Sequence, residues 1–214
     1  MTKDLIKGFK SFKNHEYGDA SDNLMQHLVE DGQSPKYFII SCIDSRTDPG
    51  TIFHTRPGSF FAHKAMGAIV RPYKQGTALA AALQFAVEYN NVEQIIVLGH
   101  TKCGAVKALI DGLDDPEISS FINVAKNALT KVKSCCDESD DITARTEQEV
   151  VLESAENLKT YPSIAKALEE NSVKISPWIF DMETGDILEH DKASNEFKII
   201  TTNTTKIEDI NHHA

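Results

Sequence analysis

The sequence has no apolar run that approaches the roughly 20 residues a helix needs to cross a bilayer, so it predicts no membrane partner. The opening segment, MTKDLIKGFKSFKNHEY, lacks the apolar centre of a signal peptide, and we therefore expect a cytoplasmic protein. Basic residues are few: 22 Lys and Arg stand against 32 Asp and Glu, for a formal net charge of −10. This acidic balance argues against nucleic acid as a partner, because phosphate backbones are negatively charged.

Cysteine is also scarce, with 4 residues in a chain of 214. In a reducing compartment such thiols stay free or bind metal, so no disulfide framework is expected. The sequence shows no internal repeat and no low-complexity linker. Its length suits one sizeable core, and we expect a single catalytic domain over residues 1–214.

Apolar patterns predict an alternation of strands and helices. Strands without polar alternation are typical of a parallel sheet with helices on both sides, which is an α/β fold. In such sheets ligands bind at the carboxyl ends of the strands. We expect strands over 37–41, 59–65, 94–98, 173–180 and 187–188, an N-terminal helical segment over about 3–31, and further helices over 76–89, 104–113, 117–134 and 144–170.

Two polar stretches follow predicted strands: SCIDSR, which contains Cys42, and GHTKC, which contains His100 and Cys103. Two thiolates and an imidazole make a good zinc set, and three protein ligands with an open fourth position are typical of catalytic zinc. Asp44 is two residues past Cys42 and, on an extended segment, would point to the same side. It could close the site as a fourth ligand, or face a metal-bound water.

Arg46 favours the second alternative, because a guanidinium that clamps Asp44 would turn the carboxylate from the metal and keep it ionised. Asp44 could then accept a proton from zinc-bound water. In the competing interpretation, the Asp44–Arg46 pair only fixes a loop. A zinc-bound hydroxide held in this way suits attack on a small electrophilic carbon, which indicates hydration or hydrolysis without identifying the substrate.

The combination of C-x-D-S-R at Cys42 to Arg46 and H-x-x-C at His100 to Cys103 resembles the signature of the β-class carbonic anhydrases, and the likeness covers roughly residues 5 to 200. The resemblance implies a zinc enzyme that interconverts CO2 and bicarbonate, on a parallel sheet, as a homodimer or larger homo-oligomer. It implies zinc ligands at Cys42, His100 and Cys103 and a catalytic pair at Asp44 and Arg46.

The resemblance also implies substrate-pocket residues at Gln33, Phe61, Phe85 and Gly104, assembled where two chains meet. The phenylalanines would form a narrow apolar slot for an uncharged gas, and Gln33 would hydrogen-bond a bicarbonate oxygen. Relatives often carry Tyr where Phe85 stands, so that hydroxyl is missing.

After the PG turn, the family usually has an acidic residue and then, past two or three apolar residues, Arg-Asn. Here Ser59 and Lys64-Ala65 stand instead. Two alternative functions are therefore kept open: a hydrolase of carbonyl sulfide or carbon disulfide, and a non-catalytic zinc protein that senses bicarbonate with Asp44 on the metal. In some family members bicarbonate closes the site by binding Trp, Arg and Tyr; Ile39, Lys64 and Phe180 occupy those positions here.

Overall fold

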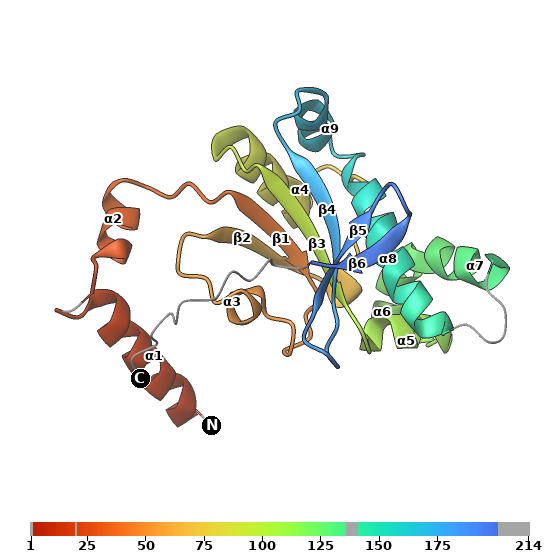
Figure 1. Ribbon diagram of the computed structural model, residues 1–214, viewed down its shortest axis with the longest axis horizontal. Coiled ribbons are helices and arrows are strands. Elements are labelled where there is room, and N and C mark those ends of the chain that lie inside the picture. Colours follow the sequence, from red (N-terminus) through yellow and green to blue (C-terminus); the bar gives the residue numbers. More distant parts are fainter. Residues whose placement is uncertain (1, 20, 136–140, 201–214) are drawn as a thin grey trace.

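A six-stranded sheet forms the centre of the computed structural model, which describes residues 2–19, 21–135 and 141–200 (Figure 1). The strand order is β2-β1-β3-β4-β5-β6; neighbours among the first four are parallel, and β5 and β6 are added antiparallel. The expected α/β fold with a mainly parallel sheet is confirmed. The strands are β1 (Tyr37–Ser41), β2 (Phe60–Lys64), β3 (Gln94–His100), β4 (Lys174–Phe180), β5 (Ile187–Asp191) and β6 (Glu196–Ile199).

Several helices begin at a side chain that accepts a hydrogen bond from the first turn, as Asp48, Thr77, Asp115 and Asp141 do. The α-helices are α1 (Thr2–Tyr17), α2 (Leu24–Glu30), α3 (Pro49–Ile52), α4 (Ala78–Gln84), α5 (Gly104–Ile110), α6 (Pro116–Ile122), α7 (Lys126–Cys135), α8 (Ile142–Leu158) and α9 (Pro162–Glu169). Short helical turns of other kinds are η1 (Met66–Ala68), η2 (Phe85–Tyr89) and η3 (Asn123–Ala125). Within the described ranges, no helix combines the length and the apolar character needed to cross a membrane.

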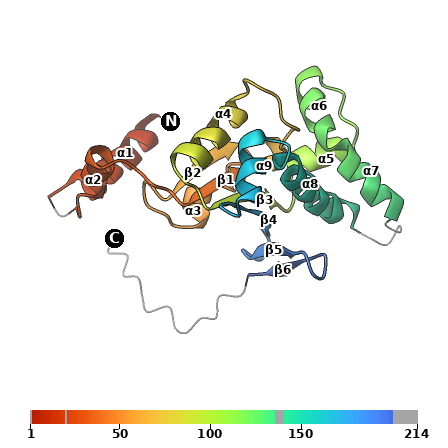
Figure 2. The ribbon, with the colours of Figure 1, turned by 90° about the horizontal axis from the view of Figure 1, so that it is seen from above.

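The two faces of the sheet are covered differently (Figure 2). On one face, alternate residues of β1, β3 and β4 pack with α4, α8 and α9 into the main core. On the opposite face, Ile39, Ile96 and Leu98 pack with Ile52 at the end of α3 and with the adjoining Phe53. A third cluster, built largely from α5, α6 and α7, includes Cys42 and Cys103 and lies beyond the carboxyl ends of β1 and β3.

Some expected helices are divided, and two short elements were not expected. The helical segment over 3–31 is two helices, because the chain turns after Gly18 and Asn23 adopts a left-handed φ of 59°. The region 144–170 divides near Pro162, since proline starts a new helix more readily than it continues one. The sequence analysis missed α3 and β6, which are both 4 residues long.

Helices α1 and α2 stand apart from the other helices, on the β2 side of the molecule (Figure 1). An ionic cluster ties them to the chain before β2. Nη2 of Arg56 donates to the buried Glu16 carboxylate at 2.8 Å, and the same guanidinium holds Asp22 through two hydrogen bonds.

Candidate metal centre and catalytic pair

Cys42, His100 and Cys103 come together at the carboxyl edge of the sheet. Cys42 directly follows β1, His100 ends β3, and Cys103 is the N-cap of α5. Because β1 and β3 are parallel neighbours, their carboxyl ends meet. One ligand atom from each residue lies within 4.8 Å of the other two, and all three residues are buried. The predicted group is therefore assembled in space and could hold a metal ion.

The chain between His100 and Cys103 is a tight turn and not a turn of helix. The strand runs through His100, and Lys102 then adopts a left-handed φ of 57° before α5 begins. This tight turn places the imidazole and the Cys103 thiol on the same side of the strand end. The predicted neighbours are correct, but the local geometry that joins them is different.

The His100 imidazole is oriented for metal binding. Its Nδ1 lies 2.9 Å from the carbonyl oxygen of Thr101, and a carbonyl can only accept, so Nδ1 carries the proton. Nε2 then offers a lone pair; it is buried and has no hydrogen-bond partner in the described structure. A buried nitrogen without a partner is costly, and a metal ion bound there would remove that cost.

The two sulfur atoms are electrostatically linked. Interaction with the neighbouring Cys103 side chain lowers the pKa of Cys42, aided by the Gly67 N–H, whose nitrogen lies 3.3 Å from Cys42 Sγ. The interaction with Cys42 in turn raises the pKa of Cys103, and burial raises it further. Zinc is bound by thiolates, so a cation held between the two sulfurs would displace any proton that they share.

Asp44 and Arg46 form a bidentate pair. Arg46 Nε donates to Asp44 Oδ1 at 3.0 Å, and Nη2 donates to Oδ2 at 2.8 Å. The guanidinium, followed by the Arg46 backbone N–H, holds the pKa of the Asp44 carboxyl far below its usual range. The predicted pairing is present, but the extended segment expected from Cys42 to Asp44 is not: the chain turns after Cys42, and the Arg46 N–H closes that turn on Asp44 Oδ1 at 2.9 Å.

Lys64 contacts the same turn from the end of β2. Its Nζ donates to the carbonyl oxygen of Thr47 at 3.2 Å, while the next residue, Ala65, donates its N–H to Ser41. The altered Lys64-Ala65 pair therefore lies beside the site, as expected. Lys64 supports the backbone that follows Arg46, and within the described structure its amine makes no hydrogen bond or ion pair with the Asp44 carboxylate.

The four predicted pocket residues are not gathered at this edge in one chain. Gly104 opens α5 next to Cys103, and a Cβ there would meet nothing within 4 Å. The rings of Phe61 and Phe85 contact each other at 5.9 Å, but Phe61 pairs with Phe38 near the amino end of β1. Gln33 precedes β1 and is exposed. The assignment of these residues to a substrate pocket stays a prediction.

Glu147 is a residue near the site that the sequence analysis missed. It lies on α8, only 4% of its surface is exposed, and Oε1 accepts the backbone N–H of Cys103 at 2.8 Å. Burial raises the pKa of this carboxyl. No local signal identifies it, because Glu147 is one of several acidic residues in an ordinary helical sequence, TEQEVVLE.

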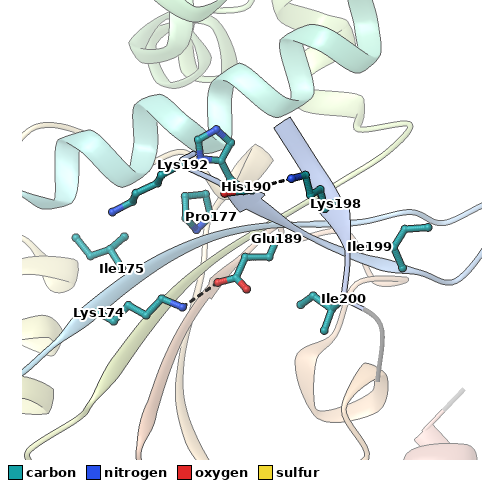
Figure 3. A pocket seen from close by; sticks show the side chains of 10 residues that line it. Lys174, Ile175, Pro177, Glu189, His190, Lys192, Lys198, Ile199 and Ile200 are labelled. Atoms are coloured by element: carbon teal, nitrogen blue, oxygen red, sulfur yellow. Dashed lines mark hydrogen bonds and ion pairs between the residues drawn. The ribbon is translucent and has the colours of Figure 1, made fainter. Parts of the chain in front are cut away.

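A hollow of about 560 Å³ lies away from these residues, over β4, β5 and β6 (Figure 3). Its charged side chains largely neutralise one another: Lys174 pairs with Glu189 at 3.0 Å, and Lys198 pairs with Asp191. Its lining begins at Lys174, the first residue of β4, whereas the metal-ligating group lies at the carboxyl ends of β1 and β3. It is therefore not part of the candidate metal centre.

The chain has an α/β fold with a residue group that could hold a metal ion, and comparison with known proteins identifies the family. A family model described as "Carbonic anhydrase" matches residues 37–187. A carbonic anhydrase from Pseudomonas aeruginosa is 32% identical over 203 residues, covering 91% of this chain and 90% of its own. One from Synechococcus elongatus is 30% identical over 199 residues, covering 90% of this chain and 72% of its own.

Solved structures agree with this match. The β-carbonic anhydrase CcaA superposes with a TM-score of 0.82 at 28% identity, over 94% of this chain and 93% of that one. A structure described among two tetrameric β-carbonic anhydrases from Sordaria macrospora gives 0.71 at 25% identity, over 88% and 92%. The chain belongs to the carbonic anhydrase family, and the resemblance drawn from its motifs is confirmed.

Proposed function

We propose that this chain is a zinc-dependent carbonic anhydrase that interconverts CO2 and bicarbonate. The observation that carries the proposal is the assembly, at one edge of the sheet, of three buried ligand residues beside an arginine-held carboxylate. Three protein ligands leave a position open, which a catalytic metal needs and a structural one does not. The hydrolase and sensor alternatives gain no specific support from the described structure.

The donor atoms fit zinc. Two sulfurs and the unpartnered Nε2 of His100 are soft and borderline ligands suited to tetrahedral zinc. When bound, zinc would act as a Lewis acid that lowers the pKa of a water molecule and so supplies a nucleophile near neutral pH. Cys42 and Cys103 donate more charge than neutral imidazoles would, so we expect this activation to be weaker than at a site of three histidines.

Asp44 is the proton-accepting partner in this proposal. Its two oxygens are held by Arg46, so the carboxylate stays ionised and faces the guanidinium rather than joining the group of metal ligands. An oxygen with remaining lone pairs can accept a hydrogen bond from water in the open position and so orient it. Arg46 acts through Asp44, by keeping it charged and by preventing it from closing the site.

The substrate is small and uncharged, and the proposed slot for it requires a second copy of the chain. Phe61 and Phe85 are in contact with each other but lie toward the other end of β1 from Cys42. A neighbouring copy would have to bring them to the metal, together with Gln33 as a donor to bicarbonate, while Gly104 leaves room beside Cys103. We therefore propose a homodimer or larger assembly; a similar structure from Sordaria macrospora is described as tetrameric.

Metal analysis combined with stopped-flow CO2 hydration tests the proposal. We expect about one zinc per chain and CO2 hydration by the wild type, and loss of both in Cys42→Ser and Cys103→Ser. Cys135→Ser, at the end of α7, is the matched control and should keep zinc and activity. Full zinc retention in both ligand variants would contradict the ligand set, and a zinc-loaded wild type unable to hydrate CO2 would contradict the function.

A further inference from the structure

Glu147 places a buried carboxylate against the backbone of a proposed metal ligand. Cys103 is the N-cap of α5, and a helix does not use the N–H of its own N-cap residue. That N–H points instead to Glu147 Oε1, 2.8 Å away, in a buried hydrogen bond. Without Glu147, the Cys103 N–H would lose this partner, and a buried donor without a partner is expensive.

The packing of α8 on β3 explains how Glu147 reaches this position. A Cβ on Gly99 would lie 2.3 Å from Cγ2 of Val151, a distance at which no side chain fits. Gly99 therefore lets α8 approach the end of β3 closely. Val151 and Glu147 are four residues apart on one side of the helix, so the same approach carries Glu147 to the turn that holds His100 and Cys103.

The turn itself needs an external support. Lys102, between the two ligands, has a left-handed φ of 57°, a conformation that costs a non-glycine residue free energy. Cys103 then adopts an extended ψ of 119° before α5 starts. The hydrogen bond from Glu147 anchors the turn at the residue that carries the sulfur ligand, so it restricts where Sγ can lie relative to Cys42 and His100.

We infer that Glu147 is a positioning residue of the metal centre, which holds the Cys103 backbone so that Sγ is presented to the metal. The inference rests on the proposed function, in which Cys103 binds zinc. This role requires a hydrogen-bond acceptor at the position of Oε1. It does not require a negative charge. The competing interpretation is that Glu147 merely satisfies a buried N–H and contributes to stability alone.

Glu153 provides a matched control on the same helix. Its Oε2 accepts the backbone N–H of Ala128 at 2.9 Å, and burial raises the pKa of its carboxyl as it does for Glu147. It contacts α7 rather than the ligand turn. Shortening either side chain by one methylene removes an acceptor from a buried or half-buried N–H, but only Glu147→Asp removes it from a ligand residue.

The test is zinc affinity, measured by competition with a chromophoric chelator, together with thermal unfolding of the zinc-free proteins. Glu147→Asp keeps the charge but withdraws the acceptor, and we expect zinc to bind about 10- to 100-fold more weakly. Glu147→Gln keeps an acceptor oxygen at full reach and should stay within about fivefold of wild type, the loss of roughly 1 kcal/mol. Glu153→Asp should leave zinc affinity unchanged while lowering the melting temperature.

Two results would overturn the inference: a zinc affinity of Glu147→Asp equal to that of Glu153→Asp, or a Glu147→Gln variant as weak as Glu147→Asp. The second would mean that charge acts, not the hydrogen bond. Cys103→Ser in the same titration separates this from the proposed function. If Cys103→Ser loses zinc and Glu147→Asp does not, only the positioning role fails; if Cys103→Ser keeps wild-type affinity, the ligand set itself fails.

Discussion

At the scale of single residues, Lys64 changes the surroundings of the Asp44–Arg46 pair. Its amine donates to the Thr47 carbonyl, so it braces the turn that begins at Asp44. An ammonium lacks the planar fork with which arginine grips a carboxylate or bicarbonate. Ile39 and Phe180, which belong to the apolar cluster on one face of the sheet, offer no side-chain hydrogen-bond donor. A bicarbonate ion bound beside Lys64 would meet the ammonium charge of Lys64, but this side chain cannot hold the ion in a bidentate way.

We therefore predict that bicarbonate does not close this site. Closure would require bicarbonate to favour a state in which Asp44 leaves Arg46 for the metal, and a ligand shifts an equilibrium only by its differential affinity. The measurement is CO2 hydration across neutral and mildly alkaline pH, with and without added bicarbonate. We expect a shallow pH profile that bicarbonate does not steepen. A steep, cooperative loss of activity toward neutral pH would show that the closed state is populated.

At the scale of elements, the contact between α8 and β3 contributes to the main core and also brings Glu147 to Cys103. Gly99 lies where the helix crosses the strand, and Val151 occupies the space that a side chain would need. We predict that Gly99→Ala lowers the free energy of unfolding by about 1–3 kcal/mol, the usual cost of overpacking. It should also weaken zinc binding, because α8 would withdraw Glu147 from Cys103.

Gly8→Ala is the control for this prediction. Gly8 lies in α1 with nothing within 4 Å of the place of a Cβ, so alanine should stabilise the helix by up to about 1 kcal/mol. Urea denaturation of the two variants beside wild type measures both changes. If Gly99→Ala unfolds at the same urea concentration as the wild type, the stability of the core does not depend on the close approach of α8 to Gly99.

The junction between α1 and α2 depends on Arg56. This guanidinium lowers the pKa of Asp22 to about 2 from its ordinary value of 3.8. Because the folded pKa is the lower one, the stabilisation is complete above about pH 4 and is lost as pH falls toward 2. We predict that Arg56→Ala makes the link between α2 and β1 readily cleaved by protease at neutral pH, while Arg71→Ala, outside the cluster, does not.

The same reasoning extends to acid conditions. In the wild type, protection of this link should persist at pH 5 and fall between about pH 4 and pH 2, which pepsin digestion can follow. Equal cleavage rates for wild type and Arg56→Ala at neutral pH would show that the ion pairs do not hold the helices in place.

The strands that carry the site were predictable from sequence, because YFIIS and QIIVL are continuous apolar runs of a kind that a parallel sheet buries. The candidate metal-binding group could be predicted as well, because both motifs follow such strands. The backbone conformation of the turns and the contacts between residues far apart in the chain could not be predicted from the sequence. The turn at Asp44 and the left-handed Lys102 leave no periodic signal, and Glu147 meets Cys103 only because α8 packs on Gly99. Strand β6 was missed because EFKI is short and half polar.

At the scale of the whole molecule, α1 exposes an apolar side that one chain does not cover. Leu5 is 77% exposed, Phe9 60% and Ile6 49%, on a helix that stands apart from the main body. Apolar surface of this kind is typical of a protein interface. It agrees with the proposal that Phe61 and Phe85 serve the metal centre of a second copy.

We predict an active dimer or larger assembly, and that Leu5→Asp with Phe9→Asp shifts it toward single chains with lower CO2 hydration at low protein concentration. Sedimentation velocity gives the mass, and Lys3→Asp with Lys10→Asp, polar residues of the same helix, is the control for added charge. An active species with the mass of one chain would contradict the need for a second copy.

The central claim is that the Asp44–Arg46 pair serves a zinc ion held by Cys42, His100 and Cys103. The most direct measurement is stopped-flow CO2 hydration by Asp44→Asn at matched zinc content. Asparagine keeps the shape but cannot be an ionised acceptor, so we predict wild-type zinc binding with turnover reduced at least about 100-fold, the usual range for general acid–base groups. An Asp44→Asn protein that binds zinc and turns over CO2 at nearly the wild-type rate would contradict the account.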